Sequence, residues 1–198
     1  MAISPKLEEL LRSARVKYTA AKHPVAYTAQ EIAASQHVPG RQLAKCVLVK
    51  TQRGPVLAVL SATDLVDLAR LKSALRVTQL SIAKEADIKE RFPDVEIGAM
   101  SPFGNLYGVP VVVDKSLGEA QAIVFNAGSH TETIRMAYRD FAALAKPTVA
   151  GFARPRDEAK AKSKTRKAKR TTKGGKHAAR AGKRPRTAAR KTARRRRS

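Results

Sequence analysis

The sequence predicts one mixed α+β domain followed by a basic tail, the domain being a curved, mainly antiparallel sheet flanked by helices. Two observations support this. In residues 1–152, strand-like and helix-like apolar patterns alternate irregularly, and fit neither a series of βαβ units nor the regular spacing of an all-β protein. Charge also divides the chain, because residues 1–152 carry 19 Lys and Arg against 14 Asp and Glu, whereas residues 153–198 carry 21 against two.

Two helices are predicted near the N-terminus. Ser4 and Pro5 begin the first, since serine is a common N-cap and proline suits the first helical position, and residues 7–14 follow with an apolar stripe at helical spacing. Residues 28–31 have the pattern of a capping box, which predicts a second short helix ending near Gln36.

The middle of the chain predicts a hairpin and a helix. Residues 46–49 and 56–60 are nearly continuous apolar runs joined by a turn at 52–55, which is typical of strands covered on both faces. Asp64 is then the predicted N-cap of a helix that ends at Leu75.

The remaining elements of the domain follow from the same patterns. They are a short strand at 77–80, a helix at 82–91, strands at about 109–113, 122–126 and 132–137, and a helix at 140–144. Residues 98–104 form a loop rich in residues that permit tight turns.

The tail, residues 153–198, contains no aromatic residue and no Ile, Leu, Val or Met. Without apolar side chains to bury, such a segment is predicted to be disordered when free. Its basic residues end in Arg194, Arg195, Arg196 and Arg197, and their density favours binding to nucleic-acid phosphates without sequence preference. A solvated solubility tail and a patch for anionic lipid are the alternatives.

Several classes of protein and site lack support in the sequence. The single cysteine excludes an internal disulfide, and the four scattered histidines lack metal-ligand spacing, so no metal site is predicted. No apolar run approaches the length of a membrane span, which predicts a soluble, cytoplasmic protein without a membrane partner. The G-x-S-x-G elbow, the P-loop and the dinucleotide fingerprint are all missing.

Three places in the domain could carry chemistry, each with a structural alternative. Lys45 directly precedes an apolar strand, and is either a snorkelling lysine or a cation positioned for a carbonyl, carboxylate or phosphate. The loop 98–104 is either a plain connection or a backbone path that points several polar groups at a ligand. The polar cluster 126–130 ends in His130, which is either a structural histidine or a general base.

Cys46 follows Lys45, which could lower the pKa of its thiol and so make it a nucleophile. However, Cys46 lies within an apolar strand, where a free cysteine usually packs as a small hydrophobic residue. Packing is therefore the preferred interpretation.

These places lie within four segments that, taken together, resemble the YbaK family, also called the prolyl-tRNA synthetase editing-domain superfamily. The segments are Ala44-Lys-Cys-Val-Leu-Val49, Glu96-Ile-Gly-Ala-Met-Ser-Pro-Phe-Gly104, Pro110-Val-Val-Val-Asp114 and Phe125-Asn-Ala-Gly-Ser-His130. The resemblance covers roughly residues 4–147 and implies a YbaK-like fold for the domain, 1–152.

The resemblance implies a cofactor-free hydrolase that removes a wrong, small amino acid from tRNA, often tRNA(Pro). It implies catalytic roles for Lys45, Gly98 and His130, the last matching a histidine of some branches only. The implied substrate-binding residues are Cys46, Met100, Ser101, Pro102, Phe103, Gly104, Asn126, Gly128 and Ser129. Branches that clear alanine or serine often have asparagine at position 46, so the amino acid removed is left open.

The tail allows a second hypothesis from another class. In this alternative the domain is a non-catalytic scaffold, and the histone-like tail binds DNA or ribosomal RNA. Under the first hypothesis the tail instead supplies the tRNA affinity that a free-standing editing domain lacks.

Overall fold

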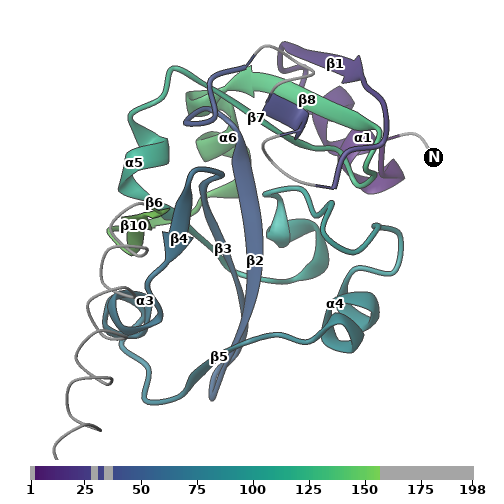
Figure 1. Ribbon diagram of the computed structural model, residues 1–198. Helices are drawn as coiled ribbons and strands as arrows, with labels where there is room; N and C mark the ends of the chain where they lie inside the picture. Colours follow the sequence, from purple (N-terminus) through teal and green to yellow (C-terminus); the bar gives the residue numbers. More distant parts are fainter. Residues whose placement is uncertain (1–2, 28–30, 34–37, 157–198) are drawn as a thin grey trace, which may run out of the picture. The chain divides into compact units, whose positions relative to one another are not determined.

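The computed structural model describes residues 3–27, 31–33 and 38–156, all within the first of the two compact units of the chain, Met1–Glu158 (Figure 1). The predicted tail, with Arg194, Arg195, Arg196 and Arg197, lies outside these residues apart from its first four positions. Of the helix predicted over 28–36, residues 31–33 are described and are helical.

A five-stranded mixed sheet forms the centre of the domain, in the order β5-β2-β3-β6-β9. Its strands are β2 (Ala44–Thr51), β3 (Gly54–Ser61), β5 (Leu80–Ile82), β6 (Val111–Asp114) and β9 (Thr148–Ala150). The β2–β3 hairpin is antiparallel and turns at residues 52–53, after which Gly54 takes a φ of +112° that favours glycine. Strands β3, β6 and β9 are parallel neighbours.

Two smaller antiparallel sheets complete the strand structure. One has the order β1-β8-β7 and the other pairs β10 with β4. Their strands are β1 (Tyr18–Lys22), β4 (Asp64–Val66), β7 (Ala122–Asn126), β8 (Glu132–Ala137) and β10 (Ala153–Pro155). The predicted α+β class is thus confirmed, with three sheets in place of a single curved one, and with two parallel pairs in the largest.

The helices are short and lie around these sheets (Figure 1). They are α1 (Pro5–Ser13), α3 (Leu68–Ala74), α4 (Glu85–Arg91), α5 (Lys115–Gly118), α6 (Tyr138–Ala145) and the 3-10 turn η1 (Gly104–Tyr107). The predicted N-cap at Asp64 is wrong. Asp64 begins strand β4, and the helix begins after Asp67, whose carboxylate accepts hydrogen bonds from the N–H groups of Ala69 and Arg70.

The two faces of the β2–β3 hairpin pack against different parts of the chain. One face joins the main core, where the ring of Phe103 makes edge contacts with Phe125 and Phe141 at centroid distances of 5.7 and 5.5 Å. The other face packs against Leu71 of α3 and against Phe152. Alternate residues of β2 therefore point into different environments, which decides where Lys45 and Cys46 point.

The last described residues are fixed to the sheet by one buried carboxylate. Asp114, at the end of β6, accepts hydrogen bonds from the backbone N–H groups of Phe152 at 2.6 Å and Ala153 at 2.7 Å. It also accepts from the N–H and the hydroxyl of Ser116. Because β10 follows Phe152, the described fold continues past the boundary predicted at that residue.

Candidate functional site

A cavity of about 210 Å³ lies where β2 begins, and it brings together residues that are far apart in the sequence, from Tyr27 to Asn126. Five of the predicted site residues line it, namely Lys45, Cys46, Gly98, Met100 and Asn126. The other lining residues are Tyr27, Ile32, Leu43 and Ala44. The lining combines apolar side chains with polar surface, and Lys45 and Asn126 are its basic and amide residues.

Lys45 is the one basic residue among the described residues that line the cavity. It pairs across the hairpin with Leu60, so both side chains leave the sheet on the face that packs against Phe152. The Lys45 ammonium donates to the carbonyl oxygens of Asp64 and, at 3.4 Å, of Ala62. An ammonium has three N–H donors, so these two bonds leave one unused in the described part of the chain.

The surroundings of Lys45 hold the pKa of its amine below the usual range. Burial, which disfavours the charged form, is the main cause, and the positive charge of Arg156 adds to it, while Asp64 acts in the opposite direction. Arg156 follows β10 directly, so the C-terminal end of the described chain reaches the vicinity of the site.

Cys46 points to the opposite face from Lys45. It pairs with Val59 and packs, half-buried, against the main core. Burial raises the pKa of its thiol far above the usual range, so that the thiolate nucleophile is not formed at neutral pH. This geometry favours the packing role over the nucleophilic one.

The substitution Cys46→Ala tests that assignment. For the deacylation that the family resemblance implies, we expect an unchanged kcat and a shift in the amino acid preferred, with a loss of about 1 kcal/mol in the free energy of unfolding from the vacated volume. Turnover of a panel of aminoacyl-tRNAs by the purified variant is the measurement, and Cys46→Ser controls for volume. A complete loss of turnover in a folded variant would show that the thiol takes part in the chemistry.

Gly98 lines the cavity and packs against His130, which does not line it. Gly98 has a φ of +91°, and a Cβ added there would lie 3.3 Å from Cε1 of His130. The His130 ring is fixed by a 2.9 Å contact between Nε2 and the carbonyl oxygen of Ile97, and it lies 4.8 Å from the ring of Tyr27. His130 is not among the described residues that line the cavity, and its ring packs beside Gly98 and Tyr27.

The rest of the predicted loop is buried beneath the cavity. Met100 lines it, whereas Ser101, Pro102, Phe103 and Gly104 do not. Phe103 lies in the main core, and a Cβ at Gly104 would come within 2.7 Å of the carbonyl oxygen of Val109. The loop therefore needs its small residues for packing, and presents only its first part to a ligand.

Gly128 and Ser129 do not line the cavity, and Gly128 packs against Ser4 near the N-terminus. A Cβ at Gly128 would lie 3.0 Å from the Cβ of Ser4, whose backbone N–H donates to the carbonyl oxygen of Ala127. Ser129 is buried, with its hydroxyl 3.3 Å from that of Thr131.

Asn126 reaches the cavity from the end of β7. Its Oδ1 is buried and has no hydrogen-bond partner in the described part of the chain. A buried acceptor without a partner is costly, and a donor on a bound ligand would satisfy it.

Four residues of the site were not predicted from the sequence. Leu43 and Ala44 precede the strand and Ile32 follows the capping box, so each resembles an ordinary core residue. Tyr27 is 76% exposed, and an exposed aromatic residue near a motif was the one available signal. Glu96, whose carboxylate accepts from the N–H of His130 at 2.9 Å, was also missed.

Neither a metal site nor a membrane span is found in the described ranges. No group of three or more His, Cys, Asp or Glu side chains there could hold a metal ion. No helix among these residues is long and apolar enough to cross a bilayer.

Comparison with known proteins gives a family and a fold. The profile of the aminoacyl-tRNA editing domain matches residues 23–144. The fold is similar to that of a protein described as a "putative trans-editing enzyme for prolyl tRNA synthetase", with a TM-score of 0.68, 20% identity, and coverage of 77% of this chain and 99% of that one. It is also similar to the hypothetical protein APE2540, with a TM-score of 0.69, 16% identity, and coverage of 75% and 99%. No curated protein matches the chain.

Proposed function

Since the chain belongs to the aminoacyl-tRNA editing domain family, we propose that it acts in the cytoplasm as a free-standing hydrolase of mischarged aminoacyl-tRNA. The observation that carries the proposal is the single cavity shared by Lys45, Gly98 and Asn126. These groups complement an aminoacyl ester, which has a carbonyl oxygen that becomes negative during hydrolysis and an ammonium that needs an acceptor.

In this proposal, the free N–H donor of Lys45 orients the ester and stabilises the oxyanion, while the Oδ1 of Asn126 accepts from the ammonium of the amino acid. A water molecule adds to the carbonyl carbon, and the bond to the terminal ribose oxygen breaks. The water gives one proton to that leaving oxygen, so the products are tRNA and the free amino acid.

Among the described residues that line the cavity, none is a general base at neutral pH. The Lys45 amine donates to two carbonyl oxygens, the thiol of Cys46 is protonated, and His130 lies behind Gly98. The proposal therefore assigns the activation of water to groups of the substrate. An aminoacyl ester is already activated, and positioning with a fixed charge supplies several kcal/mol.

The size of the cavity favours a small amino acid. Its volume of about 210 Å³ must hold both the ester and the side chain, and Ile32, Leu43 and Met100 form apolar walls. One methylene group more or less changes binding by about 1–3 kcal/mol in such a pocket. On the strength of the family resemblance, we extend the proposal to amino acids wrongly attached to tRNA(Pro).

The direct test is a deacylation assay with the purified protein and a panel of mischarged tRNAs. We expect turnover of at least one tRNA that carries a small amino acid, well above spontaneous hydrolysis, and little turnover of those with large side chains. An absence of turnover across the panel would overturn the proposal in favour of the scaffold alternative.

The tail makes a separate prediction. Its 21 Lys and Arg residues between positions 153 and 198 are expected to bind tRNA phosphates. A chain ending at Glu158 keeps β10 and should retain its kcat while its KM for tRNA rises and the salt dependence of binding becomes shallower. Kinetics and tRNA binding at several salt concentrations are the measurements. An unchanged affinity and slope would point to another partner, with DNA or ribosomal RNA tested next.

A further inference from the structure

A large hollow of the described surface lies away from the candidate site. It has a volume of about 690 Å³ and lies between the end of α1, strands β1 and β8, and the start of α6. Its charged residues are Arg15, Lys17, Arg135, Arg139 and Asp140. We refer to this hollow as the basic groove.

The fold itself brings these cations together. Arg135 pairs with Thr19 across the β1–β8 ladder, so both side chains leave the sheet on the same face, and Lys17 comes two residues before Thr19. Arg135 is exposed between the buried Ile134 and Met136, which shows that it lies on the outer face of β8. Arg15 ends the α1 region in a left-handed conformation, with a φ of 53°.

The positive charge of the groove is poorly compensated. Arg139 lies 3.4 Å from the carboxylate of Asp140, whereas Arg15, Lys17 and Arg135 have no carboxylate within 4.0 Å in the described part of the chain. Like charges gathered without partners disfavour the compact state, unless an anion binds them. The groove thus has the charge of a binding surface for phosphates.

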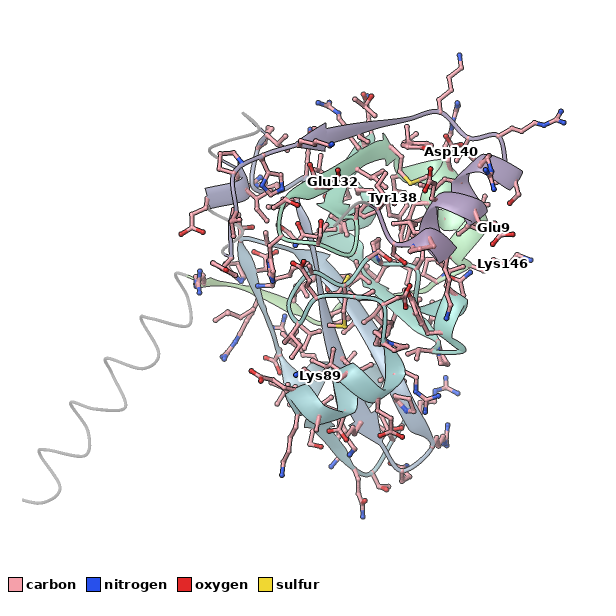
Figure 2. All side chains as sticks on the ribbon, turned by 90° about the vertical axis from the view of Figure 1, so that its right-hand side faces the viewer. Glu9, Lys89, Glu132, Tyr138, Asp140 and Lys146 are labelled. Carbon is pink, nitrogen blue, oxygen red and sulfur yellow. The ribbon has the colours of Figure 1, made fainter. Side chains whose placement is uncertain are left out.

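The path of the chain connects the groove with the candidate site. Strand β1 begins in the groove at Tyr18 and rises by about 3.3 Å per residue, so that Lys22 lies roughly 13 Å further on. Five residues later, Tyr27 lines the cavity. Figure 2 labels Asp140 in the groove and Glu132, the partner of Lys22, at the other end of β8.

From these observations we propose that the basic groove binds the sugar-phosphate backbone of the tRNA whose aminoacylated 3′ end occupies the cavity. The identity of this ligand as tRNA rests on the proposed function, whereas its chemical class, a polyphosphate chain, rests on the groove. A small anion would be bound by one or two cations at a single point. The groove instead has four cationic side chains spread over several elements, which suits a chain of phosphates. Tyr18, which is 37% exposed in the groove, offers a ring for a sugar or a base.

The test reverses two charges in the full-length chain, as Lys17→Glu with Arg135→Glu. The matched control is Lys89→Glu with Arg91→Glu on helix α4, which changes net charge equally at two other exposed positions (Lys89 is labelled in Figure 2). The tail is present in the unmodified chain and in every variant. The difference in tRNA binding between the groove variant and the α4 variant therefore reports the contribution of the groove. Thermal denaturation of both establishes that they are folded, and Lys17→Gln with Arg135→Gln gives a milder version.

For the groove variant we expect a rise of about tenfold or more in the Kd for uncharged tRNA. The slope of log Kd against log salt concentration should also become shallower, by the amount that corresponds to the loss of about two phosphate contacts. In deacylation, the KM for aminoacyl-tRNA should rise at an unchanged kcat. Hydrolysis of an aminoacyl-adenosine ester, which has no backbone to reach the groove, should be unaffected.

A groove variant that binds tRNA like the α4 control would overturn the proposal. So would a loss of binding confined to vesicles containing phosphatidylserine, which would make the groove a lipid surface. If the unmodified protein hydrolyses neither substrate, the proposed function fails, and the Kd for uncharged tRNA still decides whether the groove binds RNA.

Discussion

Lys45→Met is expected to lower kcat/KM for deacylation by about 100-fold or more, because it removes the only cation that lines the described cavity and keeps the aliphatic stem. The fold should remain, since the two bonds of the ammonium are to carbonyl oxygens of Ala62 and Asp64 on a half-buried edge. We expect a loss of about 1 kcal/mol or less in the free energy of unfolding. Single-turnover hydrolysis and urea denaturation are the measurements.

Lys50→Met is the matched control for this prediction. Lys50 lies on the same strand, but it is exposed and pairs with Asp87 at 2.7 Å, far along β2 from the cavity. The substitution Lys50→Met should therefore leave the deacylation activity unchanged. Full activity in a folded Lys45→Met protein would remove Lys45 from the proposed chemistry.

The second large effect concerns stability. Asp114→Ala leaves the N–H groups of the buried Phe152 and the half-buried Ala153 without their acceptor, and we expect a loss of about 3 kcal/mol in the free energy of unfolding. Ser116→Ala, which removes only a hydroxyl that donates to the same carboxylate, should cost about 1 kcal/mol. The midpoints of urea unfolding measure both. Equal midpoints for the two variants would contradict the anchoring role of Asp114.

The same carboxylate predicts a dependence on pH. Burial alone raises the pKa of Asp114, but its hydrogen bonds, first that from the Ser116 side chain, hold this pKa below the usual range. A lowered pKa in the folded state stabilises the protein above the unfolded value of about 3.9, and this contribution is lost as the pH falls further through the folded value. The free energy of unfolding of the Asp114→Asn variant should therefore fall less steeply with decreasing pH, below about pH 4, than that of the unmodified protein.

The sequence was most informative where apolar runs were long. The β2–β3 hairpin was predicted because its two runs are uninterrupted and both its faces are covered. Strand β1 was missed because its side chains are largely exposed. Strands β4, β9 and β10 were missed because each has only three residues, too few to show an alternation of apolar and polar side chains. The parallel pairing of β3 with β6 depends on contacts between distant segments, which local patterns do not encode.

The site was predicted in part for a related reason. The motifs located Lys45, Gly98 and Asn126, since these residues belong to short segments of recognisable composition. They could not show that Lys45 and Cys46 point to opposite faces in different surroundings, because that depends on the register with Leu60 and Val59. Nor could they separate Met100, which lines the cavity, from Phe103, which packs beneath it.

The protonated thiol of Cys46 has a consequence for oxidative chemistry. Peroxides and alkylating reagents attack the thiolate, so a thiol whose pKa is raised by burial reacts slowly even where it borders a cavity. Cys46 is also the only cysteine of the chain, so intramolecular disulfide exchange is impossible. The Cys46 thiol is therefore expected to be modified only slowly by oxidants and alkylating reagents, although it borders the candidate site.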